Sequence, residues 1–204
     1  MHRLNSLQML QQILIWITEN YIELLATIFG LLYLFLSIKQ NIWCWPAGLI
    51  TSALYVYVFF VTKFYADMGL QVYYVFVSIY GWYHWKYGSR SKKNDDLKIS
   101  KTNNKTALCL IVITGVLFVL IAYILVNFTD STVPYWDSFT TAASFVATWM
   151  LARKMLEHWL IWIIVDGISL GLYLYKGLYP TVILFAVYTL LAVLGYFEWK
   201  RKME

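Results

Sequence analysis

The chain has 204 residues, of which 61% are hydrophobic and 13% are charged, and its formal net charge is +5. Soluble globular domains hold about 45–50% apolar and about 25% charged residues, so this composition excludes an ordinary soluble domain. The two cysteines, Cys44 and Cys109, lie in apolar stretches without metal or redox spacing, which argues against a disulfide scaffold and a zinc centre.

Apolar segments of membrane length predict an all-α polytopic membrane protein. The N-terminal segment, residues 1–20, mixes Gln with Leu, Ile and Trp over positions 4–19. This favours an amphipathic helix at the membrane surface, with an extra span as the alternative. Residues 107–126 carry no charge over 20 positions, the length that crosses a hydrocarbon core of about 30 Å. Seven transmembrane helices are predicted, at residues 21–38, 42–60, 65–85, 107–126, 138–152, 159–175 and 179–199.

An internal repeat relates the first three predicted helices to the last three. After a shift of 114 positions, six residues match in one register: Trp45/Trp159, Tyr65/Tyr179, Tyr74/Tyr188, Gly81/Gly195, Trp85/Trp199 and Lys86/Lys200. Each unit holds three helices, so a single span between the units is needed to keep them parallel. We therefore predict 3+1+3 parallel repeats, with a binding site between them near the midplane. The predicted parts are a first three-helix repeat at 21–85, a basic linker at 86–106, a connecting transmembrane helix at 107–126, a second three-helix repeat at 138–199 and a tail at 200–204.

Lysine and arginine are distributed unequally between the two sides of the membrane. Arg3, Lys63 and Lys176 lie on one side of the seven spans. The other side holds many more basic residues, and the positive-inside rule assigns that side to the cytoplasm. The linker and tail are therefore expected inside and the N-terminus outside. Because topology accounts for the charges, nucleic-acid binding is not expected. The cytoplasmic side carries the remaining thirteen of the 16 basic residues, Lys39, Lys86, Arg90, Lys92, Lys93, Lys98, Lys101, Lys105, Arg153, Lys154, Lys200, Arg201 and Lys202.

A polar stripe follows the third predicted helix. Gln71, Tyr74 and Ser78 are spaced by three and four residues, so they share one helical face. Such side chains either face a ligand or join neighbouring helices by hydrogen bonds. We favour the ligand, because the Gln71 amide needs partners at both of its ends.

The two repeats differ in polarity where Ser52 aligns with Asp166. Asp166 lies near the middle of its span, where an ionised carboxylate costs about 2.5–3.5 kcal/mol on insertion scales. No Lys or Arg lies at matching depth, so a cationic ligand is one suitable partner, and a protonated Asp166 bonded between helices is the alternative. Trp162 precedes Asp166 by four residues and offers an aromatic plane that suits a flat heteroaromatic cation.

The other aromatic residues and the histidines have ordinary explanations. His2, His84 and His158 lie near helix ends without metal spacing, and no nucleophile has a base beside it. Enzyme activity, a bound metal and a cofactor are therefore not expected. Each histidine is assigned to the membrane interface, and so are four belt tryptophans, Trp43, Trp82, Trp85 and Trp199.

Three stretches resemble the Pnu family of bacterial vitamin transporters: KFYADMGLQVYYVFVSIYGWYHW, WDSFTTAASFVATWMLARKMLEHWLIW and LYLYKGLY. The resemblance covers about residues 21–200. It implies a fold similar to the SWEET sugar transporters, a homotrimer in the inner membrane, and facilitated diffusion coupled to a cytoplasmic kinase that traps the vitamin.

Departures from the family pattern bear on the substrate. Members that carry nicotinamide riboside tend to have Asn where this chain has Thr51, Ser78 and Asp166, and an Asn amide suits a carboxamide. The carboxylate here favours thiamine over nicotinamide riboside, although both are cations. A structural membrane subunit is the alternative from another class. The expected residues for a small cationic vitamin are Gln71, Tyr74, Ser78, Trp162, Asp166, Thr51, Ser52 and Tyr188, the last as the repeat partner of Tyr74.

Overall fold

A computed structural model describes residues 12, 15, 18, 21–61, 65–88, 97–175, 177 and 179–204. Most of the predicted amphipathic segment at 1–20 lies outside the described residues. The described part contains seven helices, α2 (Tyr21–Ile38), α3 (Cys44–Val61), α4 (Tyr65–Tyr87), α5 (Asn104–Phe128), α6 (Pro134–Ala152), α7 (His158–Tyr175) and α8 (Tyr179–Met203). Each predicted helix is present, with ends within four residues of those predicted.

The helices extend past their apolar runs where the chain supplies caps. Asn103 precedes α5, and its side-chain oxygen accepts a hydrogen bond from the Thr106 N–H at 2.7 Å. Pro134 stands in the first turn of α6, where its missing N–H costs nothing. These capping signals explain why α5 and α6 begin three and four residues earlier than hydropathy alone predicts.

Four helices of the described part are long and apolar enough to cross a membrane. They cover Cys44–Val61, Asn104–Phe128, His158–Tyr175 and Thr181–Met203, while Leu24–Ile38 forms a shorter apolar helix. The α4 and α6 sequences are interrupted by polar residues, among them Asp67 and Asp137. Seven transmembrane spans therefore remain a prediction.

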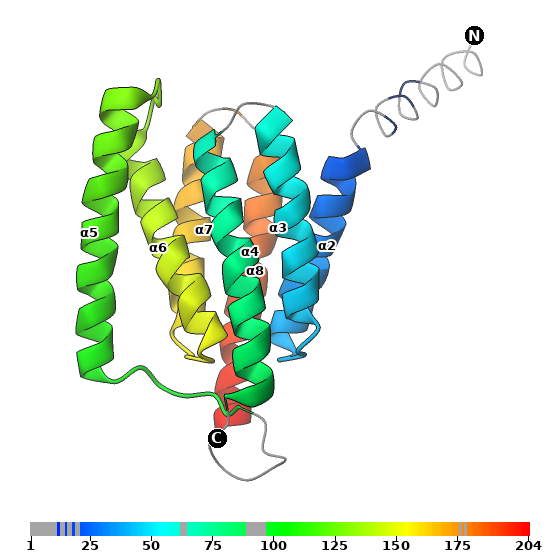
Figure 1. The fold of residues 1–204 in the computed structure, drawn as a ribbon, viewed down its shortest axis with the longest axis vertical. Coiled ribbons are helices and arrows are strands. Elements are labelled where there is room, and N and C mark those ends of the chain that lie inside the picture. Colours follow the sequence, from blue (N-terminus) through cyan, green and yellow to red (C-terminus); the bar gives the residue numbers. More distant parts are fainter. Residues whose placement is uncertain are drawn as a thin grey trace.

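Six helices form a closed ring, and α5 stands outside it (Figure 1). Around the ring, α2 packs on α3, α3 on α4, α4 on α6, α6 on α7, α7 on α8, and α8 on α2. Among the described helices, α5 packs on α6 alone. The α2–α3 turn, the α6–α7 turn and the C-terminus lie together at one end, the lower end in Figure 1, which we call the basic end.

Four buried tryptophans pack the ring together at the basic end. Trp45 and Trp85 meet edge to face at 5.4 Å, and Trp159 and Trp199 do the same at 5.8 Å. All four are at most 5% exposed. Trp85 and Trp199 are thus core residues, and their predicted place in an interfacial belt was wrong. Trp43 and Trp82, the other two belt candidates, are 66% and 42% exposed.

His158 also departs from its predicted place at the interface, because the ring packing encloses it completely. Its ring centre lies 4.5 Å from that of Trp159 and 4.8 Å from that of Trp199. Its Nδ1 is 2.6 Å from the Met155 carbonyl oxygen. The histidine therefore belongs to the tryptophan core, where a position near a helix end does not mean exposure.

The packing of the basic end occurs twice, 114 residues apart in the chain. Trp85 Nε1 donates to the Leu151 carbonyl at 3.3 Å, and Trp199 Nε1 donates to the Ser37 carbonyl at 3.0 Å. Each bond joins the first half of the chain to the second. Two further features match across the same shift. The other two tryptophans each contact a glycine, Trp45 contacting Gly81 and Trp159 contacting Gly195. Helices α2 and α6 are each followed by a residue with positive φ, Gln40 and Lys154.

Part of the predicted linker is held against the α6–α7 turn. The Ser100 N–H donates to the Lys154 carbonyl at 2.9 Å, and the Leu156 N–H donates to the Ser100 carbonyl at 3.0 Å. Glu157 Oε2 accepts from both the N–H and the hydroxyl of Thr102, at 2.9 and 2.6 Å. These bonds fix the approach of the chain to α5 at the basic end.

Candidate functional site

Buried hydroxyls and one carboxylate distinguish the ring from an ordinary apolar bundle. Every buried polar side chain in lipid needs a partner or a ligand, because the hydrocarbon offers neither donors nor acceptors. The buried polar residues within the ring helices include Ser37 on α2, Ser52 on α3, Ser78 on α4, Ser138, Ser144 and Thr148 on α6, and Asp166 and Ser169 on α7.

Asp166 is the acidic member of this set and lies eight residues into α7, about 12 Å along the helix at 1.5 Å per residue. Its side chain is 7% exposed. Within the described part of the chain, its carboxylate has no hydrogen bond or ion pair. The hydroxyls of Tyr74 on α4 and Tyr188 on α8 are near enough to interact with it electrostatically. A cation, or a ligand with several N–H or O–H donors, would satisfy this carboxylate.

Tyr74 links α4 to α6 beside this carboxylate. The side chains of Ser144 and Thr148 lie close to its hydroxyl. Thr148 also donates to the Ser144 carbonyl one turn earlier, at 2.8 Å. A hydroxyl that donates to its own helix can still accept from a neighbour, so this cluster offers acceptor positions next to Asp166.

Tyr188 extends the polar group toward α2 and α3. It interacts electrostatically with Tyr55 on α3. The Tyr55 hydroxyl lies 3.1 Å from Thr27 Oγ1 on α2. The predicted residues Tyr74, Asp166 and Tyr188 are therefore brought together, and hydroxyls from the remaining ring helices lie close by.

Ser78 and Thr51 lie at contacts between helices. A Cβ atom added at Gly48 would stand 3.3 Å from Ser78 Oγ and 2.9 Å from Tyr33 Cδ2, so α2, α3 and α4 approach closely there. Thr51 donates to the Ala47 carbonyl at 3.0 Å, which uses its O–H donor within α3 and leaves its oxygen able to accept. Its methyl group lies 3.6 Å from a Cβ built at Gly30.

Three other predicted residues have no described contact with Asp166. Trp162 is half-buried and packs against the tryptophan core. Gln71 is half-buried on α4, and Ser52 is buried on α3. For Gln71 and Ser52, the described contacts establish burial and not a surface shared with Asp166.

Ser144 and Thr148 were missed from the sequence. Both lie in the predicted span at residues 138–152, whose many Thr, Ala and Ser residues suit close helix packing as well as ligand binding. The available signal was their spacing of four residues, which places two hydroxyls on one face in the same way as the α4 stripe. Only the ring closure between α4 and α6 brings that face against Tyr74.

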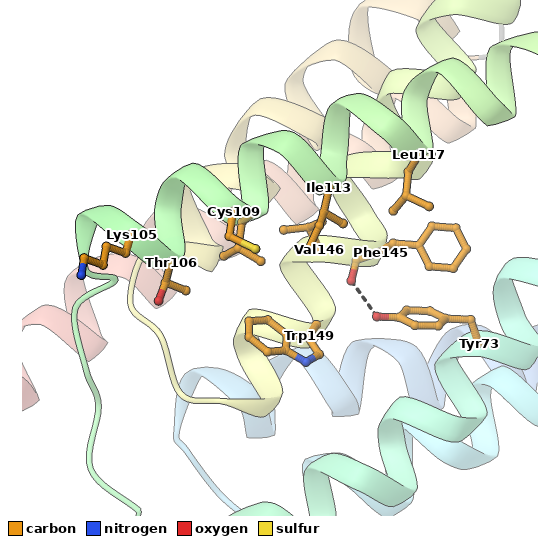
Figure 2. A pocket seen from close by; sticks show the side chains of 10 residues that line it. Tyr73, Lys105, Thr106, Cys109, Ile113, Leu117, Phe145, Val146 and Trp149 are labelled. Carbon is orange, nitrogen blue, oxygen red and sulfur yellow. Dashed lines mark hydrogen bonds between the residues drawn. The ribbon is translucent and has the colours of Figure 1, made fainter.

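No cluster of three or more His, Cys, Asp or Glu side chains that suits a metal ion is found among the described residues. A groove of about 630 Å³ does occur, between α4, α5 and α6 (Figure 2). None of the eight predicted binding residues lines it. The polar interior of the ring, and not this groove, is therefore the candidate ligand site.

A ring of helices with a buried polar interior is the architecture of a membrane transporter. The chain matches the family model described as nicotinamide mononucleotide transporter over residues 20–201, and it belongs to that family. The resemblance inferred from the sequence is confirmed. The family consists of multi-pass membrane transporters, which agrees with the expectation that the chain is not an enzyme.

Two relatives and one solved structure are similar over most of the chain. The nicotinamide riboside transporter PnuC of Escherichia coli (strain K12) is 30% identical, with 88% of this chain and 85% of that protein covered. The riboflavin/roseoflavin transporter RibM of Streptomyces davaonensis is 25% identical, with 87% and 83% covered. The crystal structure of the vitamin B3 transporter PnuC has a TM-score of 0.73 at 22% identity, covering 98% of this chain and 89% of that one, and shows the shared fold.

Proposed function

We propose that the chain carries nicotinamide riboside across the inner membrane. The observation that carries the proposal is the buried Asp166 carboxylate beside Tyr74 and Tyr188, which has no hydrogen-bond or ion-pair partner among the described residues. Nicotinamide riboside holds a positive charge on a flat aromatic ring and hydroxyls on its ribose, so it can satisfy both the carboxylate and the surrounding hydroxyls. The name of the E. coli relative supports this substrate over thiamine, which the sequence had favoured.

In this proposal, each part of the ligand has its own group of residues. Asp166 is the counter-ion of the pyridinium ring, and Trp162 stacks on that ring. Tyr74 and its partners Ser144 and Thr148 accept or donate hydrogen bonds to the carboxamide or ribose. Tyr188 and Ser78 complete the site, and Gln71, Ser52 and Thr51 are outer members.

We further propose that the ring is two parallel three-helix repeats joined by α5, in the 3+1+3, SWEET-like arrangement. The hydrogen bonds of Trp85 and Trp199 support it, because the two donors and also the two acceptors lie 114 residues apart. Equivalent repeats give the site two related ways to open, which suits facilitated diffusion. The family resemblance adds a homotrimer and a cytoplasmic kinase that traps the vitamin.

Transport by purified protein tests the substrate. Proteoliposomes that contain the full chain should take up labelled nicotinamide riboside, and excess unlabelled nicotinamide riboside should compete. Thiamine and riboflavin serve as competitors of other chemistry. Stronger competition by thiamine would restore the sequence-based preference. Absence of uptake of labelled nicotinamide riboside, thiamine and riboflavin, each tested in turn, would favour a structural subunit. Net accumulation driven by a sodium or proton gradient would contradict facilitated diffusion.

The orientation follows from the positive-inside rule, with the basic end cytoplasmic and the N-terminus outside. A cysteine introduced at exposed Lys101 reports on that end. In a Cys109→Ala background, Lys101→Cys should resist an impermeant thiol reagent added to intact cells and react after permeabilisation. Labelling in intact cells would reverse the proposed topology.

A further inference from the structure

The groove of Figure 2 lies outside the ring, on the side of α5 that meets α4 and α6. It exists because α5 packs on α6 and not on α4 among the described helices, so the space between α4 and α5 is left open. Helix α5 has the highest mean hydropathy of the four candidate spans, 3.0. A groove along such a helix opens to the hydrocarbon core of the membrane.

Beyond Lys105 and Thr106 at one end, the walls of the groove are mainly apolar. Cys109, Ile113 and Leu117 line it from α5, and Phe145 and Val146 line it from α6. The lining residue from α4 is a tyrosine, Tyr73, whose hydroxyl donates to the Phe145 carbonyl at 2.7 Å and is thereby occupied (Figure 2). These walls suit a hydrocarbon chain and offer little to the polar vitamin proposed above.

The length of the groove corresponds to one leaflet of a bilayer. Its lining on α5 runs from Lys105 to Leu117, a rise of twelve residue steps, or about 18 Å at 1.5 Å per residue. Half of a hydrocarbon core of about 30 Å is about 15 Å. One acyl chain of a lipid in the leaflet at the basic end would therefore extend along the groove.

The mouth of the groove is positively charged. Lys105 lines this end and is exposed. Arg153 lies one turn beyond the lining residue Trp149, with its guanidinium carbon 5.6 Å from the Trp149 ring centre. Its Nη1 donates to the Tyr80 hydroxyl at 3.3 Å, which holds the guanidinium between α4 and α6. No acidic side chain is among the described residues that line the groove.

We propose that this groove binds an anionic phospholipid. The phosphate-containing headgroup lies between Lys105 and Arg153, and one acyl chain lies along Ile113 and Leu117. Basic pockets between helices on the cytoplasmic side are suited to such headgroups. The site is separate from Asp166, so it goes beyond the proposed transport function and is tested without a transport assay.

Native mass spectrometry of the purified full-length protein tests the proposal. The probes are phosphatidylglycerol and phosphatidylcholine with identical acyl chains. The unmutated protein should retain phosphatidylglycerol preferentially. Lys105→Gln should reduce that preference about fivefold, the factor equivalent to about 1 kcal/mol for one basic residue near the headgroup. Lys101→Gln is the charge control, since Lys101 is equally exposed at the same end and does not line the groove.

A second pair of variants tests the acyl-chain position. Ile113→Trp fills the groove and should abolish retention of the bound lipid. Ile111→Trp, at a 67% exposed position that does not line the groove, should leave retention unchanged. Monodisperse elution of each variant confirms that it is folded, and Lys105→Gln still tests the site if Ile113→Trp does not fold.

Three outcomes would overturn the proposal. These are equal binding of the two phospholipids by the unmutated protein, equal effects of Lys105→Gln and Lys101→Gln, and equal retention by the two tryptophan variants. If Ile113→Trp changes the oligomeric state without changing the lipid count, a second copy of the chain covers the groove and the lipid assignment is wrong.

Discussion

The basic end of the ring and its polar interior satisfy their polar groups in different ways. At the basic end, Trp85 and Trp199 each donate an indole N–H to a carbonyl in the other half of the chain. In the interior, the Asp166 carboxylate has no hydrogen-bond or ion-pair partner within the described residues, and only tyrosine hydroxyls interact with it. The indole donors of Trp85 and Trp199 have built-in partners and hold the ring together, while Trp45 Nε1, Trp159 Nε1 and His158 Nε2 have no hydrogen-bond partner within the described residues. Within the described residues, the polar interior leaves a buried acceptor without a hydrogen-bond donor.

This difference predicts that mutations in the two regions affect different properties. Substitutions in the tryptophan core should lower stability whether or not ligand is present. Substitutions at the polar interior should lower affinity and leave the folded protein in place. A residue that changes both properties equally would weaken the distinction.

The largest expected effect is that of Trp199→Ala on stability. Trp199 is fully buried and contacts His158 and Trp159. Removing such a ring costs about 3–5 kcal/mol through lost packing and a cavity, and it leaves the Ser37 carbonyl without this donor. Thermal unfolding in detergent measures the loss. Trp43→Ala, at a 66% exposed position, is the control and should change stability little. Similar losses for both variants would contradict the role of the core.

Asp166→Asn should reduce the affinity for nicotinamide riboside by about ten- to a hundredfold, because one charge-assisted hydrogen bond contributes about 1.5–3 kcal/mol. Isothermal titration with the purified protein measures it. Unfolding in the absence of ligand should not become easier, because the variant also removes an uncompensated charge from the interior. Unchanged affinity would identify Asp166 as a protonated structural acid, since Asn retains the shape and the hydrogen bonding.

Thr148→Val sharpens the comparison within the polar interior. The substitution keeps the shape and removes the hydroxyl that interacts with Tyr74. One neutral hydrogen bond contributes about 0.5–1.5 kcal/mol, so the affinity should fall by about two- to tenfold. Thr189→Val is a matched control, because Thr189 also donates to its own helix, at 2.8 Å to the Phe185 carbonyl. Equal titrations for the two variants would place Thr148 outside the site.

The smallest effect is expected for Glu198→Gln at the basic end. Glu198 is 2.6 Å from Arg201 and 3.9 Å from Lys39, both with exposed side chains. Exposed ion pairs contribute about 0–1 kcal/mol and are screened by salt. Thermal unfolding at low and high salt should therefore differ little from that of the unmutated protein. A loss as large as that of Trp199→Ala would move the stabilising role from the tryptophans to these charges.

Much of the helical arrangement could be predicted from the sequence because the membrane allows few alternatives. Backbone groups in hydrocarbon must be bonded within their own segment, so a long apolar run becomes a helix. The run at 107–126 is included in α5, and the stretch at 21–38 coincides with α2. The shift of 114 positions also pairs residues that have equivalent contacts in the fold, such as Trp45 and Trp159.

The surroundings of single residues were decided by contacts between distant parts of the chain. Trp85 and Trp199 are tryptophans near the ends of apolar helices, as in an interfacial belt, yet the closure of the ring buries them. Thr51 has the polarity of a ligand-binding residue, yet its hydroxyl is bonded within α3. Helical periodicity indicates which residues share a face but not which element covers that face.

The sequence by itself determined the membrane as solvent, the helices, the family and the presence of a carboxylate at depth, since each depends on local composition or on short-range spacing. The tertiary structure decided which groups meet that carboxylate. Tyr74, Ser144 and Thr148 become neighbours only because α4 packs on α6, with about seventy residues between them. Helix α5 likewise acquires its groove only because it packs on α6 and leaves α4 uncovered.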